Sequence, residues 1–143
     1  MQYLRAFVAG FISTLIFHQG VYALFWLAGL APGAPYAMAP TRPFGVPAVI
    51  SLAFWGGVWG IPVWWFIRDA TAWNYWLRAI LLGAIGPTAV ALFVVFPLKG
   101  GAFAAGWNPL IIAGGLILNG AWGFGVALLM RLSGVRPAGQ YPS

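Results

Sequence analysis

Acidic residues and cysteines are almost missing from this chain of 143 residues. It contains one acid, Asp69, and no cysteine. The absence of cysteine excludes disulfides, thiol catalysis and thiolate-bound metals. A single acid excludes paired carboxylates for acid–base chemistry. It also excludes a Ser-His-Asp triad, because Asp69 lies far outside the apolar segment that holds the only histidine. We therefore expect no catalytic residues, and a protein that is not an enzyme.

Charge of either sign is scarce. Charged residues make up 6% of the chain and hydrophobic residues 62%, whereas a typical soluble domain is about 25% charged. So few charges cannot cover a surface that faces water, so most of the surface must face lipid. The net charge of +6 does not indicate nucleic-acid binding, because the bases are spread along the chain at the ends of apolar runs rather than clustered.

Four apolar runs lack Asp, Glu, Lys and Arg, and each is close to the roughly 20 residues that cross a bilayer as a helix. Backbone inside hydrocarbon must satisfy its own hydrogen bonds, so runs of this length must be helical. The first run exceeds the apolar core of a signal peptide and is read as a retained span. We predict an all-α transmembrane four-helix bundle in one domain, residues 1–136, with a short tail, 137–143. The predicted spans are 6–30, 48–67, 79–96 and 109–130.

The bases predict the orientation of these spans. Five bases fall on the side of the two termini and the second connection, and two fall on the other side. An excess of Lys and Arg marks the cytoplasmic side, so both termini are expected in the cytoplasm. The first group is Arg5, Arg68, Arg78, Arg131 and Arg136, and the second is Arg42 and Lys99. Aromatic residues near the second connection are expected to form an interfacial belt, comprising Trp64, Trp65, Trp73, Tyr75 and Trp76.

Polar residues recur near the centre of the spans. His18 and Gln19 lie at the centre of the first, Thr88 follows a Gly-Pro pair at the centre of the third, and Asn119 lies at the centre of the fourth. Polar groups at this depth are costly and usually face the interior of a bundle. We expect a hydrogen bond from His18 or Gln19 to Asn119.

Three roles for this polar group remain open: a clamp that fixes helix register, a path for water or a small solute, or a cofactor ligand through His18. We predict no cofactor and no metal site, and no span carries a carboxylate for proton coupling. Small residues in the second and fourth spans are expected to let helices approach closely. These are Gly56 and Gly60 in the second span, and Gly115 and Gly123 in the fourth.

Two further patterns concern the whole chain. The first connection, 31–47, contains five prolines and is expected to be neither helix nor central strand. The second and fourth spans both carry Trp-Gly motifs, at 54–57 and 121–124. These motifs suggest two related hairpins in parallel orientation, although chance similarity between segments rich in Gly and Trp explains them equally well.

The motifs FHQG at 17–20, PFGVP at 43–47 and FWGGVWG at 54–60 together resemble those of small bacterial four-span membrane proteins. The resemblance covers about half of the chain and implies a location, the bacterial inner membrane, but no activity. The leading prediction is a non-enzymatic structural or accessory subunit, embedded in the lipid bilayer as a homo-oligomer or within a larger complex. The alternative is a small-solute channel or transporter that uses the polar midplane site.

Overall fold

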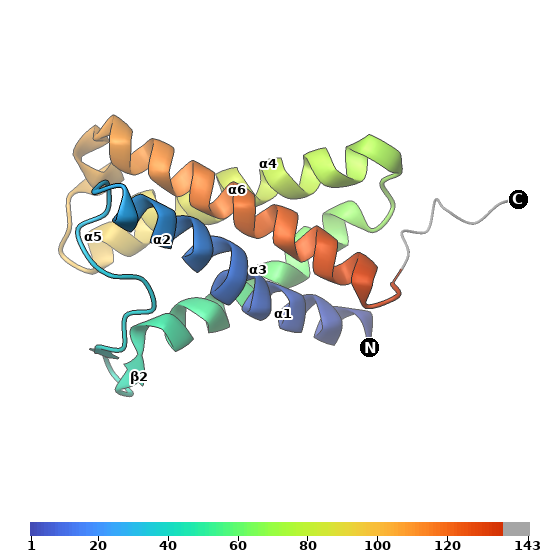
Figure 1. Cartoon of the computed structure of the whole chain (residues 1–143), viewed down its shortest axis with the longest axis horizontal. Helices are drawn as coiled ribbons and strands as arrows, with labels where there is room; N and C mark the ends of the chain where they lie inside the picture. Colours follow the sequence, from blue (N-terminus) through green and yellow to red (C-terminus); the bar gives the residue numbers. More distant parts are fainter. Residues whose placement is uncertain (136–143) are drawn as a thin grey trace, which may run out of the picture.

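The computed structural model describes residues 1–135, and four long helices dominate them (Figure 1). The first comprises α1 (Gln2–Ser13), a π-helical turn η1 (Thr14–His18) and α2 (Gln19–Leu27); the second is α3 (Ala48–Ile67). The third comprises α4 (Ala72–Val90), a π-helical turn η2 (Ala91–Val95) and α5 (Phe96–Leu98); the fourth is α6 (Pro109–Leu132). The connections contain a two-residue antiparallel ladder, β1 (Pro40–Thr41) with β2 (Val46–Pro47), and a 3-10 turn η3 (Phe103–Trp107).

The predicted all-helical class is confirmed, and all four helices are long and apolar enough to cross a membrane. The second span has the predicted bounds, 48–67, and the fourth ends two residues later than predicted. The third was predicted too short, because it begins at Ala72 rather than at residue 79. Sequence reasoning began this span after Arg78, because a base was taken as a boundary. A long basic side chain can, however, extend from within a helix to the membrane surface. The first span is shifted toward the N-terminus, ending at Leu27 rather than at residue 30. Residue Arg136 and the predicted tail 137–143 lie outside the described residues.

The two ends of the bundle differ, and we name them by what they carry. The terminal end carries the N-terminus, the turn at 68–71 and the C-terminal end of α6, whereas the loop end carries the connections 28–47 and 99–108 (Figure 1). Four of the five bases predicted on the side of the termini are described. Arg5, Arg78 and Arg131 lie in the parts of their helices nearest the terminal end, and Arg68 directly follows α3 in the turn there. Arg42 and Lys99 belong to the connections of the loop end.

The predicted aromatic belt is only partly exposed. Trp64 and Tyr75 are fully buried in the core, whereas Trp65 and Trp73 are exposed. The indole of Trp64 donates a hydrogen bond to Gln2 Oε1 at 3.4 Å, and the Tyr75 hydroxyl donates to the carbonyl of Ala127 at 2.8 Å. Two of the five aromatic residues therefore join helices instead of anchoring them in the interface.

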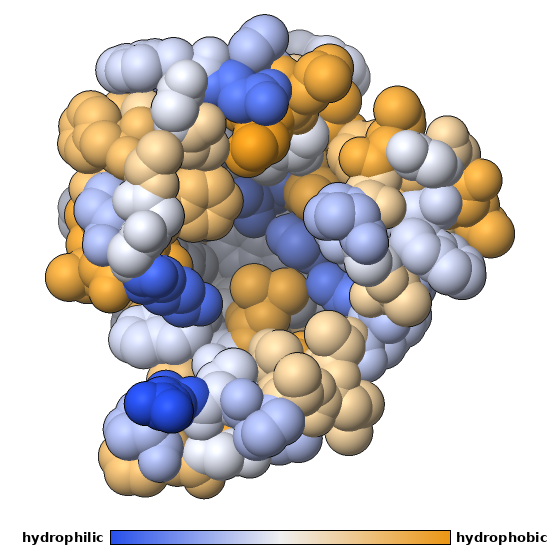
Figure 2. All heavy atoms as spheres, turned by 90° about the vertical axis from the view of Figure 1, so that its left-hand side faces the viewer, coloured by the Kyte–Doolittle hydropathy of each residue, from blue (hydrophilic) through white to orange (hydrophobic). Residues whose placement is uncertain are grey.

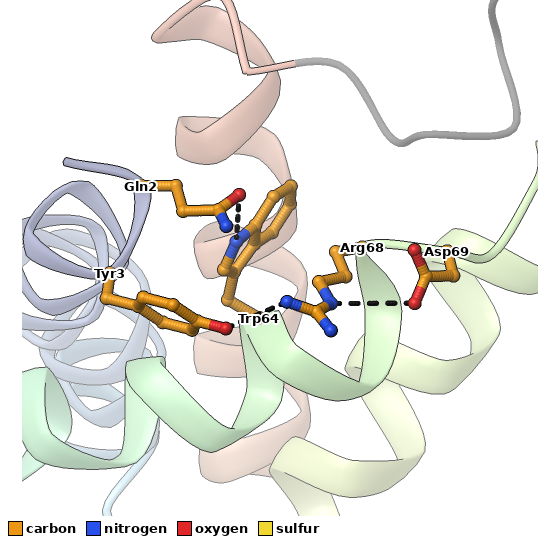
Figure 3. Close-up of polar contacts among 5 residues, drawn as sticks. All are labelled: Gln2, Tyr3, Trp64, Arg68 and Asp69. Carbon is orange, nitrogen blue, oxygen red and sulfur yellow. Dashed lines mark hydrogen bonds and ion pairs between the residues drawn. The ribbon is translucent and has the colours of Figure 1, made fainter.

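Figure 3 shows the polar contacts that surround Trp64 at the terminal end. The Arg68 guanidinium extends between α1 and the turn, and its Nη1 donates to the Tyr3 hydroxyl at 2.8 Å. Its Nε lies 3.5 Å from Asp69 Oδ2, which makes an ion pair without hydrogen-bond geometry. The only acidic side chain is thus used next to Arg68, far from the loop end.

The four long helices pack as two hairpins. α1 packs most extensively against α3, and α4 against α6, while α1 with α6 and α3 with α4 join the hairpins. Within each hairpin a glycine lies on the backbone of its partner helix. A Cβ added at Gly60 would collide with the carbonyl oxygen of Ala6, and one added at Gly123 would collide with that of Ala79. Close approach at small residues is the usual means by which membrane helices associate.

These glycine contacts place the two hairpins in a common register. Ala6 and Gly10 of the first correspond to Ala79 and Gly83 of the second, and the surrounding sequences agree: YLRAFVAG at 3–10 matches WLRAILLG at 76–83. On the partner helices, GGVWG at 56–60 matches NGAWG at 119–123. The internal repeat is therefore present, but its Trp-Gly motifs align at Trp59 and Trp122, not at the positions that the sequence alone suggested.

Contacts outside the motifs obey the same correspondence. The hydrogen bond between Trp64 and Gln2 in the first hairpin is equivalent in position to the hydrogen bond between Tyr75 and Ala127 in the second. Arg68 contacts the Tyr3 ring hydroxyl, and its counterpart Arg131 lies 5.3 Å above the ring centroid of Trp76, which occupies the place of Tyr3. Contacts of equivalent residues in both hairpins argue for a parallel repeat, whose two halves are related about an axis along the helices.

Candidate functional site

Close packing is confined to one half of the bundle. The buried hydrophobic cluster joins residues such as Ala6, Val63, Ile67, Val126 and Met130, all from the half nearer the terminal end. The other half contributes few buried apolar residues, and the bundle is hollowed there. Figure 2 views the molecule from the loop end and shows the hollow opening between the helices, with hydrophilic residues inside it. The bundle is thus a cup, sealed toward the terminal end.

Trp122 forms the seal of this cup. Its side chain is 2% exposed, and its indole Nε1 donates to the carbonyl oxygen of Gly10 at 2.9 Å. Its own carbonyl accepts a bond from the buried Ser13 hydroxyl at 2.6 Å. These two bonds connect α6 of one hairpin to α1 of the other. The equivalent Trp59 contacts Gly86 of the opposite hairpin, 3.0 Å from the position of an added Cβ. The seal therefore consists of side chains that cross between the hairpins.

A π-helical turn lies directly on the loop-end side of this seal. This turn is Thr14–His18, and at its end the N–H of Gln19 donates to the carbonyl of Thr14, five residues back. The Thr14 hydroxyl also bonds to Gly10 O at 3.0 Å, so that carbonyl receives side chains from two helices. Threonine bonds of this kind loosen a helix, and single π-turns occur frequently at functional sites. The extra residue rotates the chain, so that Gln19 is the buried residue one turn after Thr14.

The predicted hydrogen bond from His18 or Gln19 to Asn119 is not formed. Asn119 Nδ2 instead donates to the Thr88 hydroxyl at 2.9 Å, joining α6 to α4 within the second hairpin. The pair agrees with the predicted equal depth of these two residues, but the partner was wrong. The π-turn contributes to the error, because its extra residue leaves Gln19, rather than His18, as the buried residue one turn after Thr14.

Gln19 is used to hold the first connection. Its side-chain Oε1 accepts the backbone N–H of Tyr36 at 2.7 Å, and the Tyr36 hydroxyl donates to the carbonyl of Leu15 inside the π-turn at 2.8 Å. Tyr36 thus attaches the connection to the first span at two points. The sequence offers no signal for this role of Tyr36, because no sequence pattern connects it to the carbonyl of Leu15 inside a π-turn.

His18 and Asn119 retain unused hydrogen-bonding atoms. His18 Nδ1 lies 3.5 Å from Gln19 Nε2, which leaves Nε2, and the bond to Thr88 leaves Asn119 Oδ1. Among the described residues Arg68 Nε is the buried side-chain atom without a hydrogen-bond partner. His18 Nε2 and Asn119 Oδ1 are therefore not fully enclosed by the protein.

The four glycines predicted to permit helix packing all lie in contacts. A Cβ at Gly56 would collide with the Thr14 hydroxyl, and those at Gly60 and Gly123 with backbone carbonyls. At Gly115 an added Cβ would approach Thr88 Cγ2 to 3.2 Å. Gly115 therefore leaves room for the side chain that partners Asn119, whereas the other three set the distance between helices.

The site offers imidazole and amide groups in an uncharged setting. No group of three His, Cys, Asp or Glu side chains gathers within residues 1–135. These groups can donate and accept hydrogen bonds to a neutral ligand, because no formal charge lies nearby to balance an ion.

No protein-family model matches the chain, and neither a curated protein nor a solved structure is significantly similar to it.

Proposed function

We propose that the chain is a multi-pass protein of the bacterial inner membrane that admits a small neutral solute to a polar site at mid-depth. The observation that carries this proposal is the asymmetry of the bundle, which is sealed by Trp122 on one side of the polar site and hollowed on the other. With the termini in the cytoplasm, as the distribution of bases favours, the hollow opens to the outer side.

The chemistry of the site supports a neutral ligand. An ion carried to this depth would have to shed water without a counter-ion, at a cost of several kcal/mol or more. His18 Nε2 and Asn119 Oδ1 suit a small solute with hydroxyl or amide groups. The parallel repeat supports transport, since repeats of this kind in transporters surround a site at their common axis.

The absence of cysteine permits a direct test. Single variants Asn119→Cys, Ile117→Cys and Val126→Cys would be treated from the outer side with a thiol reagent that does not cross membranes. We expect Asn119→Cys to react, because the hollow leads water to it. Ile117→Cys lies at the same depth on the exposed face of α6, and Val126→Cys is buried below the seal, so both should stay unmodified. Equal protection of all three would contradict an open, water-filled hollow.

Flux gives the second arm of the test. Proteoliposomes are shrunk by glycerol, and the rate of re-swelling is followed by light scattering. We expect His18→Ala and Asn119→Ala to change this rate, while Ile117→Ala leaves it as in the wild type. A rate equal to that of empty liposomes for the wild-type protein would refute a path for neutral solutes of this class.

A second candidate is the accessory or homo-oligomeric membrane subunit that composition favours. One exposed surface of α3 supports it, because Phe54, Trp55, Trp65 and Phe66 are all about half exposed on this one helix. A defined oligomer or a stoichiometric partner retained in mild detergent would support this candidate, particularly if Trp55→Ala and Trp65→Ala released it.

A further inference from the structure

A second concave surface lies beside α3 at the loop end, away from the hollow. It has a volume of about 480 Å³, and its walls are the β1–β2 hairpin and the first two turns of α3. We define this groove by Arg42, Thr41, Ile50, Ser51, Phe54 and Trp55. None of the midplane residues lines it, so it is a separate site.

The groove carries one charge, that of Arg42, which no acidic side chain neutralises within residues 1–135. Arg42 is exposed on its rim, and the single acid of the sequence, Asp69, pairs with Arg68 at the opposite end. An anion is therefore the complementary ligand, and a guanidinium matches a phosphate with two parallel N–H groups.

The remaining walls are apolar and face outward. Ile50, Phe54 and Trp55 are between 40% and 58% exposed. Because α3 begins at Ala48, these residues lie within the first turns of a span, where the polar surface of a bilayer changes to hydrocarbon. A ligand that fills the groove must therefore be polar and anionic near Arg42 and apolar along Phe54 and Trp55.

We propose that this groove binds an anionic phospholipid from the leaflet that meets the loop end. The phosphate lies against Arg42, and the first part of an acyl chain runs along Phe54 and Trp55. The internal repeat supports a dedicated site, because the second hairpin has no counterpart of the β1–β2 ladder: its connection, 99–108, is shorter and contains the turn η3.

Lipid binding can be measured by native mass spectrometry of the full chain released from mild detergent. The protein is titrated with phosphatidylglycerol and, separately, with phosphatidylcholine of the same acyl chains. Both lipids carry the phosphate, but the choline ammonium neutralises the headgroup and competes with Arg42 for it. We therefore expect the first phosphatidylglycerol to bind about tenfold more tightly than phosphatidylcholine, the size of effect of one charge-assisted hydrogen bond. Arg42→Gln should remove this preference, and Trp55→Ala should weaken the binding of both lipids.

Lys99→Gln is the matched control, since Lys99 is the other base at the loop end and does not line the groove. It should keep the preference for phosphatidylglycerol. An equal loss in Arg42→Gln and Lys99→Gln would overturn the proposal in favour of general surface attraction. Glycerophosphoglycerol, the same headgroup without acyl chains, should compete poorly; full competition would show a soluble anion as the ligand and overturn the lipid assignment. The thiol labelling of Asn119→Cys should not change in Arg42→Gln, so this proposal and the proposed function can fail separately.

Discussion

Replacing Gly123 by alanine tests the packing on which the cup depends. An added Cβ would fall on the carbonyl oxygen of Ala79 and lie 3.1 Å from Gly83 Cα. All of these neighbours are backbone atoms, so no rotamer change can relieve the contact, and α4 and α6 must separate. Overpacking typically costs about 1–3 kcal/mol, and a backbone obstacle places Gly123→Ala near 3 kcal/mol.

Gly114→Ala on the same helix is the control. Its added Cβ would meet Phe25 Cε2 at 3.9 Å, an ordinary contact, so we expect a change below about 0.5 kcal/mol apart from the gain in helix propensity. Unfolding is followed by circular dichroism while SDS is titrated into detergent micelles. The reasoning is refuted if both variants unfold at the same SDS fraction. The repeat adds a stricter condition: Gly60→Ala, which collides with Ala6 in the equivalent place, should match Gly123→Ala within about 1 kcal/mol.

Three further substitutions test single hydrogen bonds. Asn119→Ala removes the bond to Thr88 and should cost about 0.6 kcal/mol in the same unfolding assay, the average for such bonds between membrane helices. Trp122→Phe removes the indole donor from Gly10 O and should cost about 1 kcal/mol. In the same variant a thiol reagent added from the outer side should reach Ser13→Cys, whereas with Trp122 intact we expect no labelling at this position. Tyr36→Phe releases the carbonyl of Leu15 and should speed hydrogen exchange across 31–47, whereas Tyr22→Phe, whose hydroxyl has no hydrogen bond among the described residues, should not.

The number and class of the elements follow from the sequence because they depend on hydrophobicity and length. The absence of charge in four runs determines that they are helices of spanning length, and α3 has the predicted bounds. The start of α4 was missed because its first turns carry Trp73, Trp76 and Arg78, which were interpreted as residues of the membrane interface rather than of a helix. Nothing in local composition shows that Tyr75, between them, is fully buried.

The common depth of two polar residues was predicted, but the predicted hydrogen-bond partner was wrong. Thr88 and Asn119 were correctly placed at one level, and they bond to each other. The place of Gln19 depends on the π-turn, and next to this turn Gly10 O accepts the Trp122 indole as well as the Thr14 hydroxyl. Helical periodicity contains no information about a contact from the fourth span, so the pairing of Gln19 with Tyr36 could not be predicted from the first span alone.

The most informative feature of the site is where the two repeats differ. At the position where the first hairpin has Gly56, the second has Asn119. An asparagine at Gly56 would collide with the Thr14 hydroxyl and approach the Trp122 indole, so the first hairpin must keep a glycine to close the seal. In the second hairpin the room left by Gly115 lets Thr88 and Asn119 meet. The first hairpin therefore leaves room at Gly56 for the Trp122 indole to reach Gly10 O, whereas the second hairpin presents the Asn119 amide one turn above that contact. If Asn119 were a glycine, as its counterpart Gly56 is, the tryptophan contact could remain but the amide that bonds to Thr88 would be lost.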